Sequence, residues 1–175
     1  MARLLQVAQL GHPILRQKAK EVENVRGSRI QSLIDDLLAT VMDVNGVGIA
    51  APQVYESLRI IIVASHPNPR YPNAPEMKST SMINPKILSH SKVKKKDWEG
   101  CLSITGIRGL IPRFETITIE YIDRKGEKHR KKFSNFIARI IQHEIDYLDG
   151  IVFLDRIKNN RDIITDKEYM KFISK

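Results

Sequence analysis

The segment NFIARIIQHEIDYLDG, residues 135–150, is typical of a helix that is buried on nearly all sides. Ser134 or Asn135 can cap its start, and Gly150 follows as a stop signal. Its apolar side chains surround most of the helix circumference: Phe136, Ile137, Ile140, Ile141, Ile145 and Leu148. We therefore expect this helix at the centre of a small domain, with its polar residues inside the protein.

Two of those polar residues form the first half of a metal-hydrolase pattern. In H-E-x-x-H, two histidines one turn apart hold a metal ion, and the glutamate between them acts as general base. Here His143 and Glu144 are followed by Tyr147, where the second histidine would stand. A buried His beside a buried Glu needs partners, because an unpaired polar group inside a protein is costly. Such a pair is more often structural than catalytic, so other segments must decide.

Two further segments carry residues that suit a catalytic site. NGVGIAAPQV, residues 45–54, has glycines and alanines whose backbone can approach an extended peptide closely, and Gln53 offers an amide. WEGCLSITG, residues 98–106, contains Cys101, whose thiolate could reach a metal ion. Each segment also has a simpler interpretation: a tight turn between a helix and a strand for the first, and an ordinary buried cysteine for the second.

The composition indicates one globular domain. A chain of 175 residues, with 42% hydrophobic and 28% charged residues, has the usual size and make-up of a single domain, without an apolar run that could span a membrane. Cys101 is the only cysteine, which excludes an intramolecular disulfide and favours a reducing compartment. The N-terminal residues lack a sustained apolar core, so we expect no secretory signal and a cytoplasmic location.

Hydrophobic patterns outside the central helix predict both helices and strands. Ser28 can cap a second helix, which Gly46 follows as a stop, and four prolines make residues 65–80 a surface loop. Strands are predicted in four segments, the last two forming a hairpin: 58–64, 81–88, 116–123 and 127–133. We expect a single α+β domain over residues 1–175, with mixed or antiparallel sheets packed around the central buried helix.

The chain is strongly basic, with a formal net charge of +9 and a pI near 9.7. Such a charge favours polyanions such as RNA or anionic membranes, through counterion release and long-range steering. The densest basic stretch is SKVKKKDW, residues 91–98, for which a solvated edge strand is the simpler explanation. This signal is weak alone, and we expect neither DNA nor a membrane as a partner.

Taken together, in this order and spacing, GVGIAAPQ, EGCLS and QHEIDYLDG resemble the three motifs of peptide deformylase. The resemblance covers residues 4–157: GHPILRQKA is similar to the opening segment of that family, and IPRF followed by ARIIQHE is similar to its mitochondrial-type branch. It implies a hydrolase that removes the formyl group from the N-terminal formyl-Met of nascent chains. The tail beyond Arg156 gives no further indication.

The resemblance also implies one divalent metal ion, commonly Fe²⁺ and replaceable by Ni²⁺ or Zn²⁺. Cys101 and His143 match two of its three protein ligands, and Tyr147 stands at the third-ligand position. A phenol binds metal only as phenolate, although its ordinary pKa is about 10, and its oxygen lies further from the backbone than an imidazole nitrogen. We therefore expect weakened metal binding at Tyr147.

The same resemblance assigns the catalytic and peptide-binding roles. Glu144 matches the general acid/base, and Gln53 with the backbone N–H of Leu102 matches the pair that stabilises the tetrahedral oxyanion. Val47 and Gly48 fall where family members bind the substrate backbone as an added strand.

Further positions are expected around the substrate. An apolar pocket for the methionine side chain is expected from Ile49, Phe136 and Ile140. Arg108 is expected near the mouth of this pocket, on the carboxyl side of the peptide. Arg113 and Asp146 are candidates to brace the motif helix, with an ordinary salt bridge elsewhere as the alternative.

Three functions of different class remain open at this point. The first is a deformylase with an altered metal site, impaired by Tyr147. The second is a catalytically inactive module that has kept the peptide groove and binds chain N-termini. The third is a protein that binds the ribosome or RNA through its basic charge.

Overall fold

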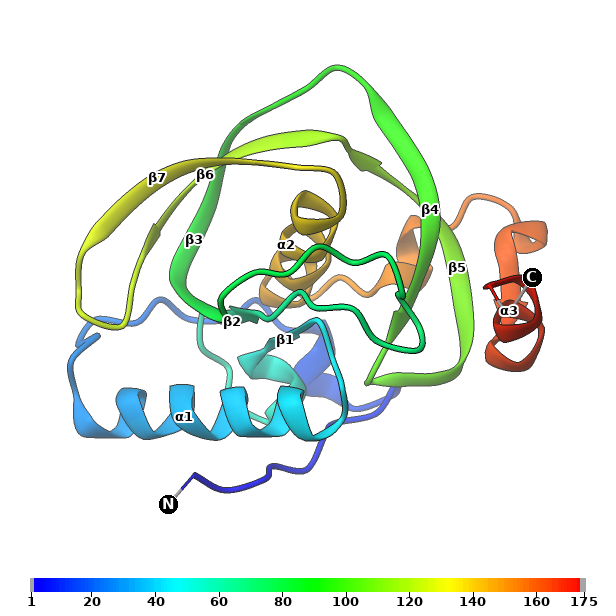
Figure 1. Cartoon of the computed structure of the whole chain (residues 1–175). Helices are drawn as coiled ribbons and strands as arrows, with labels where there is room; N and C mark the ends of the chain where they lie inside the picture. Colours follow the sequence, from blue (N-terminus) through cyan, green and yellow to red (C-terminus); the bar gives the residue numbers. More distant parts are fainter. Residues whose placement is uncertain (1, 174–175) are drawn as a thin grey trace.

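The computed structural model describes residues 2–173, which form two antiparallel sheets around one central helix (Figure 1). The central helix, α2 (Asn135–Leu148), is the one expected from its apolar pattern, and every residue from Ala138 to Leu148 is buried. Ser134 is its N-cap residue, although the Ser134 side chain makes no hydrogen bond to the helix. Gly150 follows its end with a φ of +74°, where a side chain would be strained. The predicted α+β class is confirmed.

The larger sheet has five strands, and each neighbouring pair is antiparallel. In spatial order they are β1 (Gly48–Ala50), β2 (Ile60–Val63), β3 (Thr80–His90), β6 (Thr116–Ile122) and β7 (Lys128–Ser134). The predicted hairpin is confirmed as β6 and β7, with Ile122 opposite Lys128. β1 forms one edge of this sheet, and its residues lie against α2.

The smaller sheet contains β4 (Lys94–Cys101), β5 (Ile104–Phe114) and β8 (Ile163–Thr165), in that order. β4 and β5 form a long hairpin whose closing turn places Cys101 opposite Ile104. β4 is an edge strand with exposed lysines at its start, as the simpler interpretation of the basic stretch expected. β5 and β8 were not predicted.

The remaining helices cover the sheets. α1 (Ser28–Asp43) packs its apolar face against β1 and β2, and it is capped by Gly27 rather than by Ser28, which is the first helical residue. α3 (Asp166–Ile173) lies beside β5 (Figure 1). Four short 3₁₀ helices complete the described part of the chain: η1 (Pro13–Arg16), η2 (Ala51–Val54), η3 (Phe153–Arg156) and η4 (Asn160–Asp162). Within residues 2–173, no helix has the length and apolar character needed to cross a membrane.

Candidate active site

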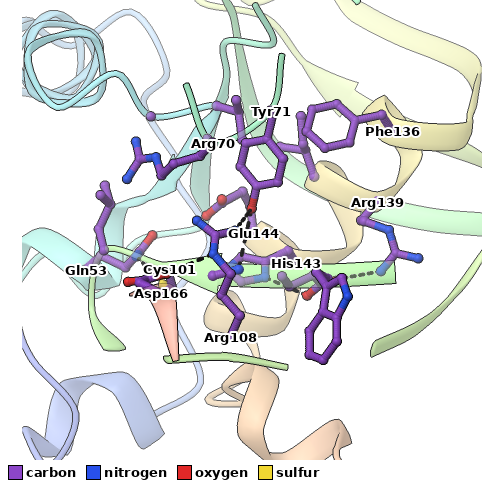
Figure 2. A pocket seen from close by; sticks show the side chains of 18 residues that line it. Gln53, Arg70, Tyr71, Cys101, Arg108, Phe136, Arg139, His143, Glu144 and Asp166 are labelled. Atoms are coloured by element: carbon purple, nitrogen blue, oxygen red, sulfur yellow. Dashed lines mark hydrogen bonds and ion pairs between the residues drawn. The ribbon is translucent and has the colours of Figure 1, made fainter. Parts of the chain in front are cut away.

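A pocket lies where the start of β1, the end of β4 and α2 meet (Figure 2). Most residues predicted from the sequence line it: Val47, Gly48, Gln53, Cys101, Leu102, Arg108, Phe136, Ile140, His143 and Glu144. Other lining residues were assigned no role from the sequence: Arg70, Tyr71, Trp98, Glu99, Arg139 and Asp166. The fold therefore brings together the three motif segments, which are far apart in the sequence.

The close approach of β1 to α2 requires Gly48. A β-carbon at Gly48 would lie 2.6 Å from Oε1 of Glu144 and 2.8 Å from Cγ2 of Ile140, well inside ordinary contact distance. Any larger residue would therefore push the strand away from the helix. The glycine in GVGIAAPQ keeps the edge of β1 next to the polar side chains of α2.

The structure corrects the prediction for Ile49. Successive side chains of a strand point to opposite faces, so a strand that turns Gly48 toward α2 turns Ile49 away from it. The Ile49 side chain is fully buried in the core cluster that also contains Leu37 and Val41 of α1. Apolar lining of the pocket comes instead from Val47, and from α2 itself through Phe136 and Ile140 as expected.

Gln53 is held with its amide nitrogen directed at Cys101. The backbone N–H of Ala50 donates to Oε1 of Gln53 at 2.8 Å, which leaves the amide nitrogen as the donor on the other side. This nitrogen donates to Sγ of Cys101 at 3.3 Å and to Oγ of Ser103 at 3.2 Å. The amide is thus fixed before any substrate arrives, which is what stabilisation of a developing oxyanion requires.

His143 is oriented by Glu99, a residue inside the WEGCLSITG segment to which the sequence assigned no role. Nδ1 of His143 lies 2.9 Å from Oε2 of Glu99. Burial disfavours the charged ring, but the hydrogen bonds to Cys101 and Glu99 outweigh burial and raise the pKa of His143 well above its ordinary value. The buried imidazole has the partner that its burial required.

Glu99 lies at the centre of a buried ion-pair network. Arg113 donates to both of its carboxylate oxygens at 2.9 Å, and Arg139 donates to Oε1 at 2.7 Å. Burial alone would raise the pKa of Glu99, but the charge of Arg113 and hydrogen bonds from His143 and Arg113 hold this pKa well below its usual range. Arg113 also binds Asp146 of α2, the contact expected to brace the motif helix.

Glu144 has one carboxylate oxygen without a partner. Its Oε2 atom is buried and has no hydrogen bond from any part of the chain that the structure describes. Burial is the main cause that raises the pKa of Glu144 to about 7, with the charge of His143 acting in the opposite direction. A carboxyl group of this kind can take up and release a proton near neutral pH, as a general acid/base must.

Tyr147 lies behind the pocket, fully buried, with its phenol oxygen 2.9 Å from Sγ of Cys101. Burial and the neighbouring Cys101 sulfur raise the pKa of Tyr147 well above its ordinary value. The raised pKa favours the protonated phenol, and a hydrogen bond joins this phenol to the sulfur. A metal ligand must offer the lone pair of a phenolate, which the raised pKa of Tyr147 disfavours.

This geometry does not fit a metal ion held by three protein ligands. Sulfur and oxygen atoms that share one tetrahedral Zn²⁺ lie roughly 3.5 Å apart, from bonds of about 2.3 and 2.0–2.2 Å. The Cys101 and Tyr147 atoms are at hydrogen-bond distance instead, and the raised pKa of Tyr147 disfavours its phenolate form. Cys101 and His143 suit a divalent metal by their chemistry; Tyr147 does not.

A second group of ligand-type side chains lies in the β6–β7 hairpin and consists of Asp123, Glu127 and His129. The carboxylate of Asp123 already accepts hydrogen bonds from the backbone N–H groups of Lys125 and Glu127, and it lies 2.8 Å from the His129 ring. These contacts explain why the three side chains lie close together: they stabilise the turn of the hairpin.

Comparisons with known proteins agree with the resemblance of the motifs. The polypeptide deformylase family matches residues 4–162. The chain is similar to peptide deformylase 2 of Nostoc sp., with 56% identity over 98% of this chain and 96% of that protein. It is also similar to a Met-Ala-Ser-bound crystal structure of class I type b peptide deformylase from Acinetobacter baumannii, with a TM-score of 0.87, 46% identity, and coverage of 90% of this chain and 100% of that chain.

Proposed function

The chain belongs to the polypeptide deformylase family, a family of metal-dependent hydrolases that act on N-formyl peptides, and we propose that its groove binds the formyl-Met end of nascent chains. The observation that supports this most directly is the convergence of Gln53, Cys101 and Glu144 at one pocket beside the edge of β1.

Peptide binding uses the free edge of β1. One side of this strand is paired with β2, and the other side borders the pocket, where Val47 and Gly48 can add a substrate strand through backbone hydrogen bonds. Phe136 and Ile140 of α2 provide an apolar surface for the methionine side chain. The scissile formyl group then lies at the inner end of the pocket, next to Glu144.

The chain's own residues supply the acid/base and electrostatic parts of the hydrolysis. Water adds to the formyl carbon, and the Gln53 amide with the Leu102 N–H stabilises the oxyanion that forms. Glu144 accepts the proton of the attacking water and transfers it to the leaving amine, so that formate and a free N-terminus are released. Its pKa of about 7 suits both halves of this transfer.

The altered metal position limits this activity. A divalent metal ion, which Cys101 and His143 would hold, would supply Lewis-acid chemistry at the formyl group. In this chain Tyr147, at the third-ligand position, is hydrogen-bonded to Cys101 instead. We propose that iron, nickel or zinc is held weakly and that deformylation is slow in consequence.

Two further candidates follow from separate observations. The Tyr147 contact with Cys101 also suits a protein that binds formylated N-termini without cleaving them. The exposed cations of β4 and β7 suit contact with the ribosome, which would keep the groove near emerging chains in the cytoplasm.

Tyr147→His tests the proposed function. This change places a second imidazole on the helix face of His143, so we expect bound metal to rise from clearly below one ion per chain to close to one. Deformylation of a formyl-Met peptide should rise at least about 100-fold, or roughly 2.7 kcal/mol of barrier. Tyr147→Phe is the matched control, because it removes the phenol without adding a ligand, and it should gain neither metal nor rate.

Groove binding is measured separately by calorimetry with a peptide hydroxamate that carries an n-alkyl side chain. Wild type and Tyr147→His should both bind it, the second more tightly. Equal metal content and equal rates in wild type and Tyr147→His would mean that the wild-type site is already complete. Failure of both proteins to bind the hydroxamate would remove the groove from the proposal.

A further inference from the structure

The C-terminal tail reaches the pocket although it lies beyond the family match, which ends at residue 162. β8 pairs with β5 so that Ile164 lies opposite Arg108, and α3 begins directly afterwards with Asp166. Lys96 binds Asp162 and secures the start of this segment to β4. The pairing brings Asp166 to the pocket rim, where it is a lining residue.

Asp166 is fixed there by Arg108. Nε of Arg108 donates to Oδ1 of Asp166 at 2.8 Å, and Nη1 of Arg108 donates to the phenol oxygen of Tyr71 at 3.0 Å (Figure 2). The Arg108 side chain is only 3% exposed, because it lies between the rings of Tyr71 and Tyr169. The positive charge of Arg108 is therefore paired with a carboxylate that the C-terminal tail supplies.

The carboxylate itself remains open to solvent. The Asp166 side chain is 47% exposed. Tyr169, one turn further along α3, donates from its phenol to the backbone carbonyl of Arg70 at 3.2 Å and so joins the tail to the loop on the other side of the pocket. Asp166 is thus a held, half-exposed negative charge at the rim of the groove.

We propose that Asp166 sets the charge preference of this site for the residues that follow the formyl-methionine. A carboxylate at the rim repels acidic side chains and attracts basic ones, and it cancels the attraction that Arg108 would exert on acidic peptides. Without it, the cations of Arg108 and Arg70 would dominate the rim. The tail thereby selects against formylated chains with aspartate or glutamate near their N-terminus. This inference rests on the proposed peptide groove.

Asp166→Asn tests the preference with little change in shape, because the amide oxygen can still accept from Arg108. Glu168→Gln is the matched control: it removes the same charge from the same turn of α3, but Glu168 binds Lys171 and does not line the pocket. The readout is the fluorescence of Trp98, the only tryptophan, which does line the pocket. It reports binding whether or not the peptide is cleaved.

The ligands are formyl-Met-Lys-Ala and formyl-Met-Ala-Lys, as C-terminal amides, each compared with its glutamate counterpart. We expect the lysine-to-glutamate affinity ratio to fall about 3- to 10-fold in Asp166→Asn, and by less than about twofold in Glu168→Gln. In wild type, the ratio should also shrink as salt is raised from about 50 to 500 mM.

The possible outcomes separate this inference from the proposed function. Binding of all four peptides with the same ratio in wild type and Asp166→Asn would overturn the inference and leave the groove in place. An equal fall in Glu168→Gln would also overturn it, since the effect would then be one of net charge. Absence of binding by any formylated peptide would count against the groove, and the inference would fall with it.

Discussion

Glu144 is a carboxyl group at a position where its ionised form is disfavoured. It is buried on α2, one oxygen has no hydrogen-bond partner among residues 2–173, and burial raises its pKa to about 7. In the unfolded chain the same group titrates near its ordinary value of about 4.3. Folding therefore changes its proton affinity, and stability must depend on pH through this one residue.

The sign of this dependence follows from the raised pKa. Between about pH 4.5 and pH 7 the folded protein holds a proton on Glu144 that the unfolded chain has released, so the contribution of Glu144 to stability is full at low pH and is lost as pH rises through about 7. Glu144→Gln cannot titrate. We expect the unfolding free energy of wild type, relative to that of Glu144→Gln, to fall by about 2–3 kcal/mol between about pH 5 and pH 8.

Urea unfolding of both proteins across this pH range measures the difference. Wild type and Glu144→Gln share all other titrating groups, whose contributions largely cancel in the difference between the two unfolding free energies. That difference therefore reports on Glu144. A difference that stays constant with pH would show that Glu144 has an ordinary pKa in the folded protein, and the acid/base role would lose its physical basis.

At the same scale, the residues that could be predicted are those whose identity alone implies chemistry. Cys101, Gln53 and His143 lie in motifs, and the structure brings them together. Glu99 lies beside one of them, but nothing local distinguishes a glutamate that reaches across to α2 from one exposed on a strand. Ile49 was misplaced because the face of a three-residue strand depends on its partner, which a sequence pattern does not reveal.

At the scale of elements, β4, β5 and α2 are held together by the Glu99 network. Glu99 on β4 accepts from Arg113 on β5 and from Arg139 and His143 on α2, and all four side chains are buried. Removing the single negative charge would leave two guanidinium groups near one another in a low-dielectric interior. The network therefore has a larger effect on stability than an exposed ion pair of the same length.

We expect Glu99→Gln to lower the unfolding free energy by about 3–5 kcal/mol, because it leaves buried charges uncompensated. The matched control is Asp97→Asn on the same strand: Asp97 is exposed, and its Oδ1 accepts from the backbone N–H of Trp98, a bond that asparagine can keep. That control should change stability by less than about 0.5 kcal/mol. Urea midpoints with unchanged slopes would measure both effects, and similar losses in the two variants would contradict the network.

Elements with a strong local pattern could be predicted, and those defined by distant partners could not. The apolar circumference of α2 and the turn between β6 and β7 are local signals. β5 contains Gly106, Gly109 and Pro112, which interrupt any strand pattern. It becomes a strand because β4 pairs with its first residue, Ile104, and with residues 109–114. β8 has three residues and exists only through its pairing with β5.

At the scale of the whole molecule, the basic charge is unevenly distributed. β7 is an edge strand of the larger sheet, and Lys128, Arg130 and Lys132 alternate along it, so their exposed side chains share one face. Edge lysines also prevent sheets from pairing with one another, which explains them without any partner. Salt dependence can distinguish this protective role from ribosome binding.

We expect measurable association with ribosomes at low salt, weakening steeply as salt rises, because a polyanion releases counterions when cations bind it. Replacing Lys128, Arg130 and Lys132 by glutamine should reduce the slope of log affinity against log salt by about two to three, if the β7 face makes the contact.

The control replaces three exposed lysines outside this face with glutamine and removes the same total charge: Lys18, Lys78 and Lys158. Cosedimentation at several salt concentrations measures all three proteins. Equal losses in the two variants would make the association a property of net charge. Cosedimentation that is absent, or insensitive to salt, would leave the β7 cations only the role of preventing this edge strand from pairing with other sheets.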